Sequence, residues 1–306
     1  MAMSAPPPIV HHPAFRAEMP AGHRFPMDKF SRLATVLESE GVPGPDGFIR
    51  PEPVDVETLR LAHDETYVRG VIELTLPADV VRRIGMPNTE SVAARACAAT
   101  GGTLLAARLA LEHGIACNTA GGSHHAAADG GAGFCVFNDV AVAARRLLAE
   151  GAIRQALVVD LDVHQGDGTA RIFENDPSVF TFSMHAEKNF PHRKVVSDLD
   201  VALADGTDDA AYLAKLSEVL PALLSSVRPD IVFFNAGVDP HADDKLGRLA
   251  LTDEGLARRE AYVLGACLSS EIPVVGVIGG GYDADIDRLA ARHAILHRTA
   301  KSLYSL

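Results

Sequence analysis

The sequence predicts a single α/β domain built as a three-layer α/β/α sandwich around a mostly parallel central sheet. Two observations indicate this class. Short β-branched runs recur along the chain, and an alanine- and leucine-rich amphipathic stretch follows most of them. Such alternation is typical of a parallel sheet covered by helices, because each crossover lays a helix on the sheet. With 306 residues, 47% of them hydrophobic, the chain is long enough to bury a core of this kind.

Strands are expected where short β-branched or aromatic runs lie between turn signals. In chain order they are IACNTA (115–120), ALVVDLDV (156–163), SVFTFSMH (178–185), DIVFFNAG (230–237) and PVVGVIGG (273–280). Apolar residues at helical spacing predict helices over about 27–40, 90–113, 138–150, 208–227, 252–270 and 284–303. Residues 1–8 are expected to form a mobile tail and residues 9–306 the domain, with the Pro- and Gly-rich segment 41–53 as a loop.

Composition and charge narrow the class of protein. The formal net charge of −12 and the pI near 5.5 argue against general nucleic-acid binding or an anionic membrane surface, and they suit a cationic substrate. The cysteines form no C-x-x-C pair and are widely spaced, which favours reduced thiols. No signal-peptide pattern and no run of about 18 apolar residues occurs. A cytoplasmic protein without a nucleic-acid or membrane partner is therefore expected.

Polar residues gather directly after each predicted strand. The segments GGSHHA, DLDVHQGD, SMH, NAGVDPHADD and GGGYD stand at five successive strand ends. Ligands of open parallel sheets bind beyond the carboxyl ends of the strands, where the loops converge. The sequence therefore predicts an active site at that edge of the sheet.

Asp162 and His164 are the first candidates for metal ligands. They alternate with apolar residues in VVDLDVHQGDG (158–168), so on an extended segment their side chains point to the same face. Two carboxylates and one imidazole would hold a catalytic ion and leave positions open for water and substrate. The residue types leave the third ligand open among Asp239, His241, Asp243 and Asp244. They also allow an ordinary polar strand end.

Proton transfer is predicted for the tandem histidines of the glycine-rich loop GGSHHAAADGGAGFC. His124 or His125 could move a proton near neutral pH if a carboxylate fixed its tautomer, and Asp160 and Asp167 are available for that role. Tyr282, after three glycines, could donate a hydrogen bond to a developing oxyanion. The alternatives are a surface histidine pair and a tyrosine that packs on a glycine turn.

Together these motifs resemble the zinc-dependent histone deacetylase superfamily. GGSHHA, GFCVFND, DLDVHQGDG, NAGVDPHADDKLG and GGGY occur in the family's order, and the resemblance extends from about residue 9 to 300. HRFPMDKF (23–30), the HQGDG form and the three glycines before Tyr282 are most similar to class IV deacetylases and their bacterial relatives. The resemblance implies the arginase/deacetylase fold, a bacterial origin and hydrolysis of N-acyl amides.

The resemblance also assigns the cations. It implies that Asp162, His164 and Asp244 hold Zn²⁺, with Fe²⁺ as the alternative, and that Asp239 is a structural neighbour. It implies a potassium ion beside Asp160, bound also by the carbonyls of Asp162, His164 and Met184 and by Ser183. Two cations and two imidazoles would compensate the negative charge that these carboxylates bring to the edge of the core.

The catalytic roles follow from the same resemblance. His125, oriented by Asp167, would act as general base and then protonate the leaving amine. His124, oriented by Asp160, would act chiefly through its charge, and Tyr282 would polarise the scissile carbonyl.

The expected substrate is an acylated lysine side chain of a peptide or protein. Phe134 and Phe190 would line its channel, and Lys29 would replace the arginine found in the internal cavity of other classes. The acyl length, from acetyl to a long fatty acyl group, stays open. Alternatives are an acylated polyamine or other small acylamine on the same site, a binuclear ureohydrolase and a non-catalytic acyl-lysine binder. The oligomeric state is not predicted.

Overall fold

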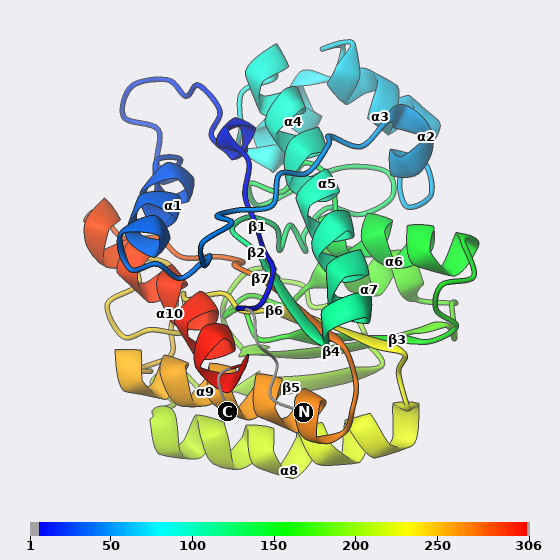
Figure 1. Cartoon of the computed structure of the whole chain (residues 1–306). Helices are drawn as coiled ribbons and strands as arrows, with labels where there is room; N and C mark the ends of the chain where they lie inside the picture. Colours follow the sequence, from blue (N-terminus) through cyan, green and yellow to red (C-terminus); the bar gives the residue numbers. More distant parts are fainter. Residues whose placement is uncertain (1–5, 305–306) are drawn as a thin grey trace.

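The computed structural model describes residues 6–304 and contains a seven-stranded sheet in which every described strand pair is parallel (Figure 1). The spatial order is β1-β2-β7-β6-β3-β4-β5. The strands are β1 (Ile9–Val10), β2 (Ile115–Asn118), β3 (Ala156–Asp160), β4 (Val179–Ala186), β5 (Leu199–Leu203), β6 (Ile231–Asn235) and β7 (Val274–Val277). The predicted fold class is confirmed.

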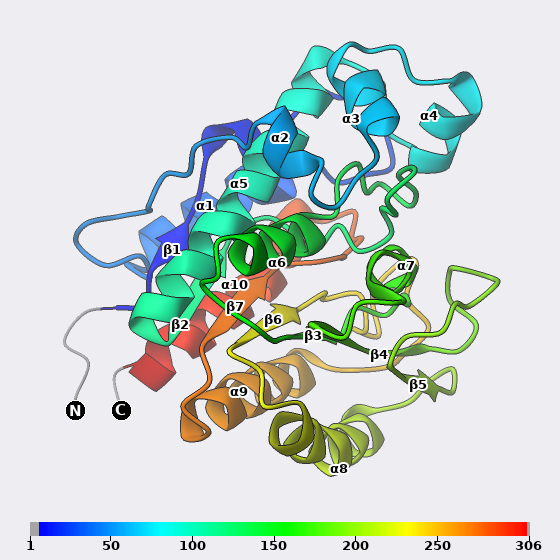
Figure 2. The same cartoon turned by 90° about the vertical axis from the view of Figure 1, so that its right-hand side faces the viewer.

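Helices cover both faces of the sheet (Figure 2). One layer contains α5 (Glu90–His113), α6 (Asp139–Ala149) and α7 (Asp167–Phe173), and the other contains α8 (Asp209–Val227), α9 (Asp253–Ser269) and α10 (Ile286–Tyr304). The remaining helices are η1 (Pro13–Phe15), α1 (Lys29–Ser39), α2 (Val56–Leu59), α3 (Glu65–Ile72) and α4 (Ala78–Ile84). Of these, α1 packs against α10.

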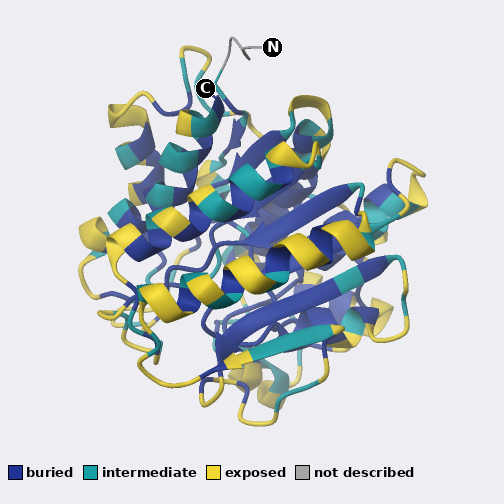
Figure 3. Ribbon diagram, turned by 90° about the horizontal axis from the view of Figure 1, so that it is seen from below, coloured by how far each residue is buried: buried dark blue, intermediate teal, exposed yellow. Residues whose placement is uncertain are grey.

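The core lies in the middle of the sheet. Every residue of β2, β3, β6 and β7 is buried, as their nearly continuous apolar runs predict for strands covered on both faces, whereas β5 at the edge is mostly half-buried (Figure 3). In the outer layer, α8 buries Tyr212, Leu216 and Leu220, which are spaced by four residues and so share one face.

Among the described helices, α8 is the one whose length and mean hydropathy of 1.2 would allow it to cross a membrane. Helices of globular domains with a buried apolar face pass the same test, and α8 packs on α9. The expectation of no membrane partner stays a prediction.

Two differences from the predicted elements matter for the site. Four predicted strands end early, and β3 stops at Asp160, so the prediction that the strand reaches residue 163 and that Asp162 and His164 share one extended segment is wrong. The Asp160 carboxylate accepts the Asp162 backbone N–H at 3.2 Å, and the chain bends there. The strands β1 and β5 and the short helices α2, α3, α4 and α7 were not predicted.

The N-terminal segment is partly described. Residues 1–5 of the expected tail lie outside the described residues. Pro7 is buried, and the Pro8 carbonyl accepts a hydrogen bond from the Cys117 backbone N–H at 3.0 Å. Contacts with the sheet therefore begin before residue 9, where the domain was expected to start.

Asn138 fixes the loop that carries the tandem histidines. Its Oδ1 accepts the Ala141 N–H and caps α6, while its Nδ2 donates to the Ala126 carbonyl at 3.1 Å and to Thr169 Oγ1 at 2.9 Å. The side chain is fully buried. It therefore ties the loop after β2 to the starts of α6 and α7.

Replacing Asn138 by Ala should lower the free energy of unfolding by about 2 to 4 kcal/mol, because a helix cap is lost and buried groups lose their partners. Denaturant unfolding measures the change. The matched control is Asp208→Ala, which removes the cap of α8 at an exposed position and should cost only about 1 kcal/mol. Equal losses for the two variants would contradict this role of Asn138.

Candidate active site

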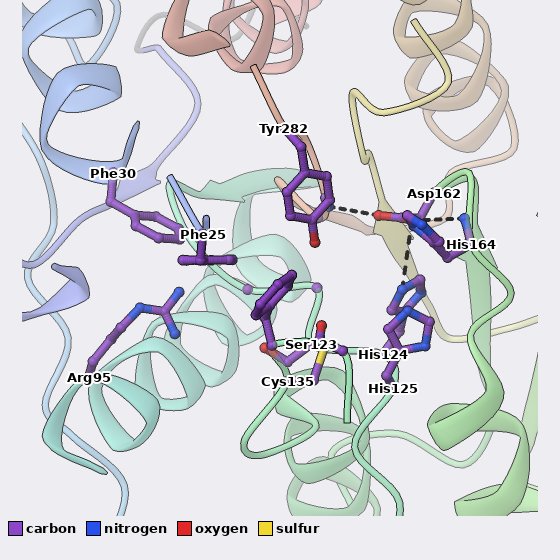
Figure 4. A pocket seen from close by; sticks show the side chains of 16 residues that line it. Phe25, Phe30, Arg95, Ser123, His124, His125, Cys135, Asp162, His164 and Tyr282 are labelled. Carbon is purple, nitrogen blue, oxygen red and sulfur yellow. Dashed lines mark hydrogen bonds and ion pairs between the residues drawn. The ribbon is translucent and has the colours of Figure 1, made fainter. Parts of the chain in front are cut away.

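The expected active site lies at the carboxyl ends of the strands, where two cavities meet. An inner cavity of about 30 Å³ and an outer one of about 470 Å³ share His125, Gly133, Phe134, His164 and Tyr282 in their linings. Figure 4 shows the inner cavity with the histidines and Asp162 on one side, Phe25, Phe30 and Arg95 on the other, and the Tyr282 hydroxyl directed between them. The shared residues therefore form the junction between a wide mouth and a small internal space.

Both predicted histidine–aspartate pairs are present. His124 Nδ1 lies 2.7 Å from Asp160 Oδ2, and His125 Nδ1 lies 2.7 Å from Asp167 Oδ1. All four side chains are buried. A carboxylate that binds Nδ1–H fixes the tautomer and leaves Nε2 as the nitrogen that can exchange a proton.

The two neighbouring histidines have opposite charge preferences. Burial lowers the pKa of His124, but the Asp160 and Asp162 carboxylates outweigh it and raise the pKa to about 9. Burial, and then the charge of His124, lower the pKa of His125 to about 4, against the opposing effect of Asp167. Near neutral pH, His124 is therefore a cation, and His125 is a neutral base.

A group suited to a metal ion lies beside the histidines. Ligand atoms of Asp162, His164 and Asp239 all lie within 4.8 Å of one another. His164 Nδ1 is 3.0 Å from Asp162 Oδ1 and 3.1 Å from Asp239 Oδ2. Among the residues that the structure describes, this is the group of at least three His, Cys, Asp or Glu side chains that could hold an ion.

The electrostatics of this group favour a cation. Burial lowers the pKa of His164, but the two carboxylates raise it to about 10, so a proton is held between them. Burial and the Asp162 charge raise the pKa of Asp239 to about 7. A divalent ion would replace that proton and stabilise both carboxylates, and the Asp, His and Asp donors are those of catalytic zinc sites. The residues present therefore fit such an ion.

Asp244 is not part of this group, although the resemblance assigns it as a ligand. Its Oδ1 accepts backbone N–H groups of Leu246 and Gly247, and its Oδ2 accepts the Tyr282 N–H at 2.7 Å. Asp239, expected only as a neighbour, takes the third place, and its Oδ1 accepts the Val163 N–H at 2.9 Å. The assignment of Asp244 stays a prediction.

Gly280 explains the glycine run before Tyr282. Its N–H donates to Asp162 Oδ2 at 2.7 Å. A Cβ at this position would lie 2.2 Å from Asp239 Oδ2 and 2.7 Å from Asp162 Oδ2. Only a glycine lets the backbone approach the carboxylates this closely.

Tyr282 and the two phenylalanines surround the junction of the cavities. The Phe134 ring centroid lies 5.9 Å from that of Tyr282, and the Phe190 ring stands edge-on to His125 at 4.8 Å. Burial, and then Asp239, raise the pKa of Tyr282 well above its usual value, so the phenol stays protonated and can donate a hydrogen bond. Phe134 and Phe190 both line the outer cavity, as a channel requires.

The residues expected around potassium lie at the same edge of the sheet. Asp160 and Ser183 are partners in the ladder between β3 and β4, and Met184 follows Ser183 in a fully buried position. The Ser183 hydroxyl lies 2.9 Å from His185 Nδ1. The potassium ion itself stays a prediction.

Arg95 is a site residue that the sequence reasoning missed. Its side chain lines the inner cavity and stacks over the Phe30 ring at 4.5 Å. Lys29, the expected cation of that cavity, is not among the lining residues, although it is buried and donates to the Gly279 carbonyl at 3.3 Å. Arg95 is on α5, and the apolar periodicity of that helix does not predict that Arg95 faces the site.

The comparisons with known proteins agree with this geometry. The sequence matches the family model described as the histone deacetylase domain over residues 23–297, so the chain belongs to the histone deacetylase family. Histone deacetylase 2 of Arabidopsis thaliana is 30% identical, with 88% of this chain and 72% of that protein covered. An uncharacterized protein of Picosynechococcus sp. is 51% identical, with 97% and 99% covered.

A solved structure shows the same fold. The crystal structure of the HD domain of HDA15 superposes with a TM-score of 0.81 at 24% sequence identity, and the match covers 98% of this chain and 92% of that one. The predicted superfamily and the deacetylase type of hydrolase are confirmed at this level.

Replacing Gly280 by Ala should weaken metal binding at least about tenfold, because the added Cβ must displace the carboxylates that hold the ion. Bound zinc, measured by titration with a chelator of known affinity, reports the change. Gly265→Ala on α9 is the control, since its Cβ would meet nothing within 4 Å, and zinc affinity should not change. Unchanged zinc affinity in Gly280→Ala would show that the close approach is unimportant.

Proposed function

We propose that the protein is a metal-dependent deacylase that hydrolyses the amide bond of ε-N-acyl-lysine in peptides or proteins. The family membership supports amide hydrolysis. The observation that carries the proposal is that a neutral imidazole, a cationic imidazole and a cation-binding group adjoin one another at the inner end of a cavity that Phe134 and Phe190 line. His125 adjoins both of the other groups, with ring centroids 4.1 Å from His124 and 5.7 Å from His164, and all three histidines line the inner cavity with Asp162.

We further propose that a zinc ion binds at Asp162 and His164 and completes its protein ligands with Asp244. The raised pKa of Asp239 and the protonated state of His164 support a divalent ion at this point. Zinc there would supply Lewis acidity toward a carbonyl oxygen and a water. Asp239, which is fully buried, faces the same nitrogen, His164 Nδ1, and would lie beside the ion, while its Oδ1 would hold the ligand loop through the Val163 N–H.

His125 takes the proton of the attacking water. Its Nδ1–H is bound by Asp167, so Nε2 is the free acceptor, and its lowered pKa keeps it neutral in the resting site. The same nitrogen then gives the proton to the departing lysine amine. His124 remains a cation throughout, because Asp160 holds it, and its charge stabilises the negative charge that builds up on the substrate.

Tyr282 donates its hydroxyl hydrogen to the carbonyl oxygen as that oxygen gains charge. The backbone that carries the phenol is held by the hydrogen bond from the Tyr282 N–H to Asp244. Its raised pKa prevents loss of the proton. A donor aimed at a developing oxyanion stabilises the transition state more than the ground state, which is what accelerates the reaction.

A binuclear ureohydrolase is less well supported. The family model that matches is that of the deacetylases. Such an enzyme would also need a second set of ligands, whereas residues 6–304 contain one three-residue group of the required kind.

Replacing Tyr282 by Phe should lower kcat on an acetyl-lysine peptide about 10²- to 10³-fold, because one oxyanion donor is lost. Zinc content should stay at the level of the unmodified protein, since the backbone bond to Asp244 is kept. Turnover with a fluorogenic peptide and metal analysis measure the two quantities. Undiminished turnover would remove this role from Tyr282.

The third metal ligand can be assigned with a pair of variants. Asp244→Ala should abolish stoichiometric zinc binding, and Asp239→Ala should weaken it about 10- to 100-fold, as expected for a residue that holds the ligand loop through the Val163 N–H. Zinc titrations of both variants at one pH make the comparison. Normal zinc affinity in Asp244→Ala, with complete loss in Asp239→Ala, would reverse the assignment.

A further inference from the structure

The outer cavity forms the mouth of the active site, and the charge of its lining is opposite to that of the whole molecule. The chain contains 40 acidic residues against 28 lysines and arginines, yet the outer cavity is lined by Arg24, Arg83, Lys188 and Arg248 and by no aspartate or glutamate. All four are exposed to solvent, as is His192, which lines the same cavity. The negative net charge therefore says little about what approaches the site.

The four permanent cations form two pairs, one on each of two walls. Arg24 and Arg83 belong to the wall with Phe134: the Arg24 guanidinium lies 5.1 Å from the Phe134 ring centroid, and Arg83 Nε donates to the Gly131 carbonyl at 3.1 Å. No ion pair involves either arginine among the described residues. Their charge is therefore available to a ligand.

Lys188 and Arg248 belong to the wall with Phe190. The two segments that carry them are joined by Asn189, whose Nδ2 donates to the Leu246 carbonyl at 2.7 Å. Both cations share one carboxylate, Asp205, with N–O distances of 3.8 Å for Lys188 and 3.2 Å for Arg248. This wall therefore keeps one positive charge in excess, and Asp205 itself does not line the cavity.

A cleft lined by charges of one sign concentrates their field at its opening and raises the local concentration of ligands of opposite charge. The outer cavity, of about 470 Å³, has room for more than an acyl-lysine stem, so residues on either side of the lysine would lie over the two walls. A single anionic group could meet only one wall. An extended peptide with carboxylates before and after the lysine could meet both.

We propose that the preferred substrate is an acylated lysine flanked on both sides by acidic residues of a peptide or protein. This inference rests on the proposed deacylase function and specifies its substrate class. It disfavours acylated polyamines, because their remaining ammonium groups would lie among the four cations of the mouth. The site would thus select by the charge around the acyl-lysine.

The test uses the zinc-loaded full chain and peptides of equal length, in which acetyl-lysine is flanked on both sides by Glu, Gln or Lys. We expect kcat/KM to fall in that order, with the Glu peptide on the order of tenfold above the Lys peptide, about a factor of two for each exposed charge pair. The difference should shrink as salt is raised, since exposed charges are screened. Equal rates for the three peptides, or a preference for Lys, would overturn the inference and leave the deacylase function standing.

Two small substrates test whether flanking carboxylates of a peptide are what the mouth recognises. An acetylated polyamine should be hydrolysed more slowly than the Gln peptide. Free Nε-acetyl-lysine with a blocked amine carries a single carboxylate and should also be slower than the Glu peptide. A polyamine hydrolysed faster than the Gln peptide, or blocked acetyl-lysine hydrolysed faster than the Glu peptide, would overturn the inference. Absence of hydrolysis with every substrate, whether acetylated or prepared with a long fatty acyl group, would overturn the deacylase function and the inference together.

Variants test whether the preference for the Glu peptide arises from the basic residues of the mouth. Arg24→Gln and Arg248→Gln should each lower the ratio of kcat/KM for the Glu and Gln peptides about twofold, because one exposed cation is removed from each wall. Arg258→Gln changes the net charge equally at an exposed position on α9 outside the lining, and it should leave the ratio unchanged. An equal change in all three variants would assign the preference to net charge, and an unchanged ratio in all three would remove it from the mouth.

Discussion

The structure depends on the burial of acidic side chains at the carboxyl edge of the sheet. Asp160, Asp162 and Asp239 are each at most 3% exposed, and each would be costly to bury without compensation. The imidazoles of His124 and His164 lie within hydrogen-bond distance of them and carry the opposing charge. Three features of the backbone bring these groups together: the early end of β3, the bend after Asp160, and the close approach of Gly280 to the Asp162 carboxylate.

This constraint explains how charge is distributed at different distances from the junction of the cavities. In the interior, carboxylates attract cations and hold His124 and His164 protonated. At the surface, basic residues line the mouth and face substrates from outside. The net charge of −12 is the sum over both regions and the rest of the surface, so it does not describe the charge of the mouth.

Much of the fold could be predicted because each long element has a local signal. The helix over 90–113 was predicted with its observed bounds, since Thr89 and Gly114 mark its two ends. The strand ends could not be predicted, because the apolar pattern continues past Asp160 while the backbone leaves the ladder. The short helices α2, α3 and α4 span one to two turns, too few for a periodicity to be detected. The pairing of His124 with Asp160 followed from family motifs, whereas Arg95 and the basic mouth arise only when distant segments meet.

The central claim is that the buried carboxylates and His164 hold one divalent ion. Anomalous diffraction at the zinc absorption edge, from crystals of the zinc-loaded protein, tests it most directly. The expected result is a single strong peak about 2.0 to 2.2 Å from a carboxylate oxygen of Asp162 and from His164 Nδ1. A map with no peak between these two side chains, or with two peaks about 3.5 Å apart, would contradict the account.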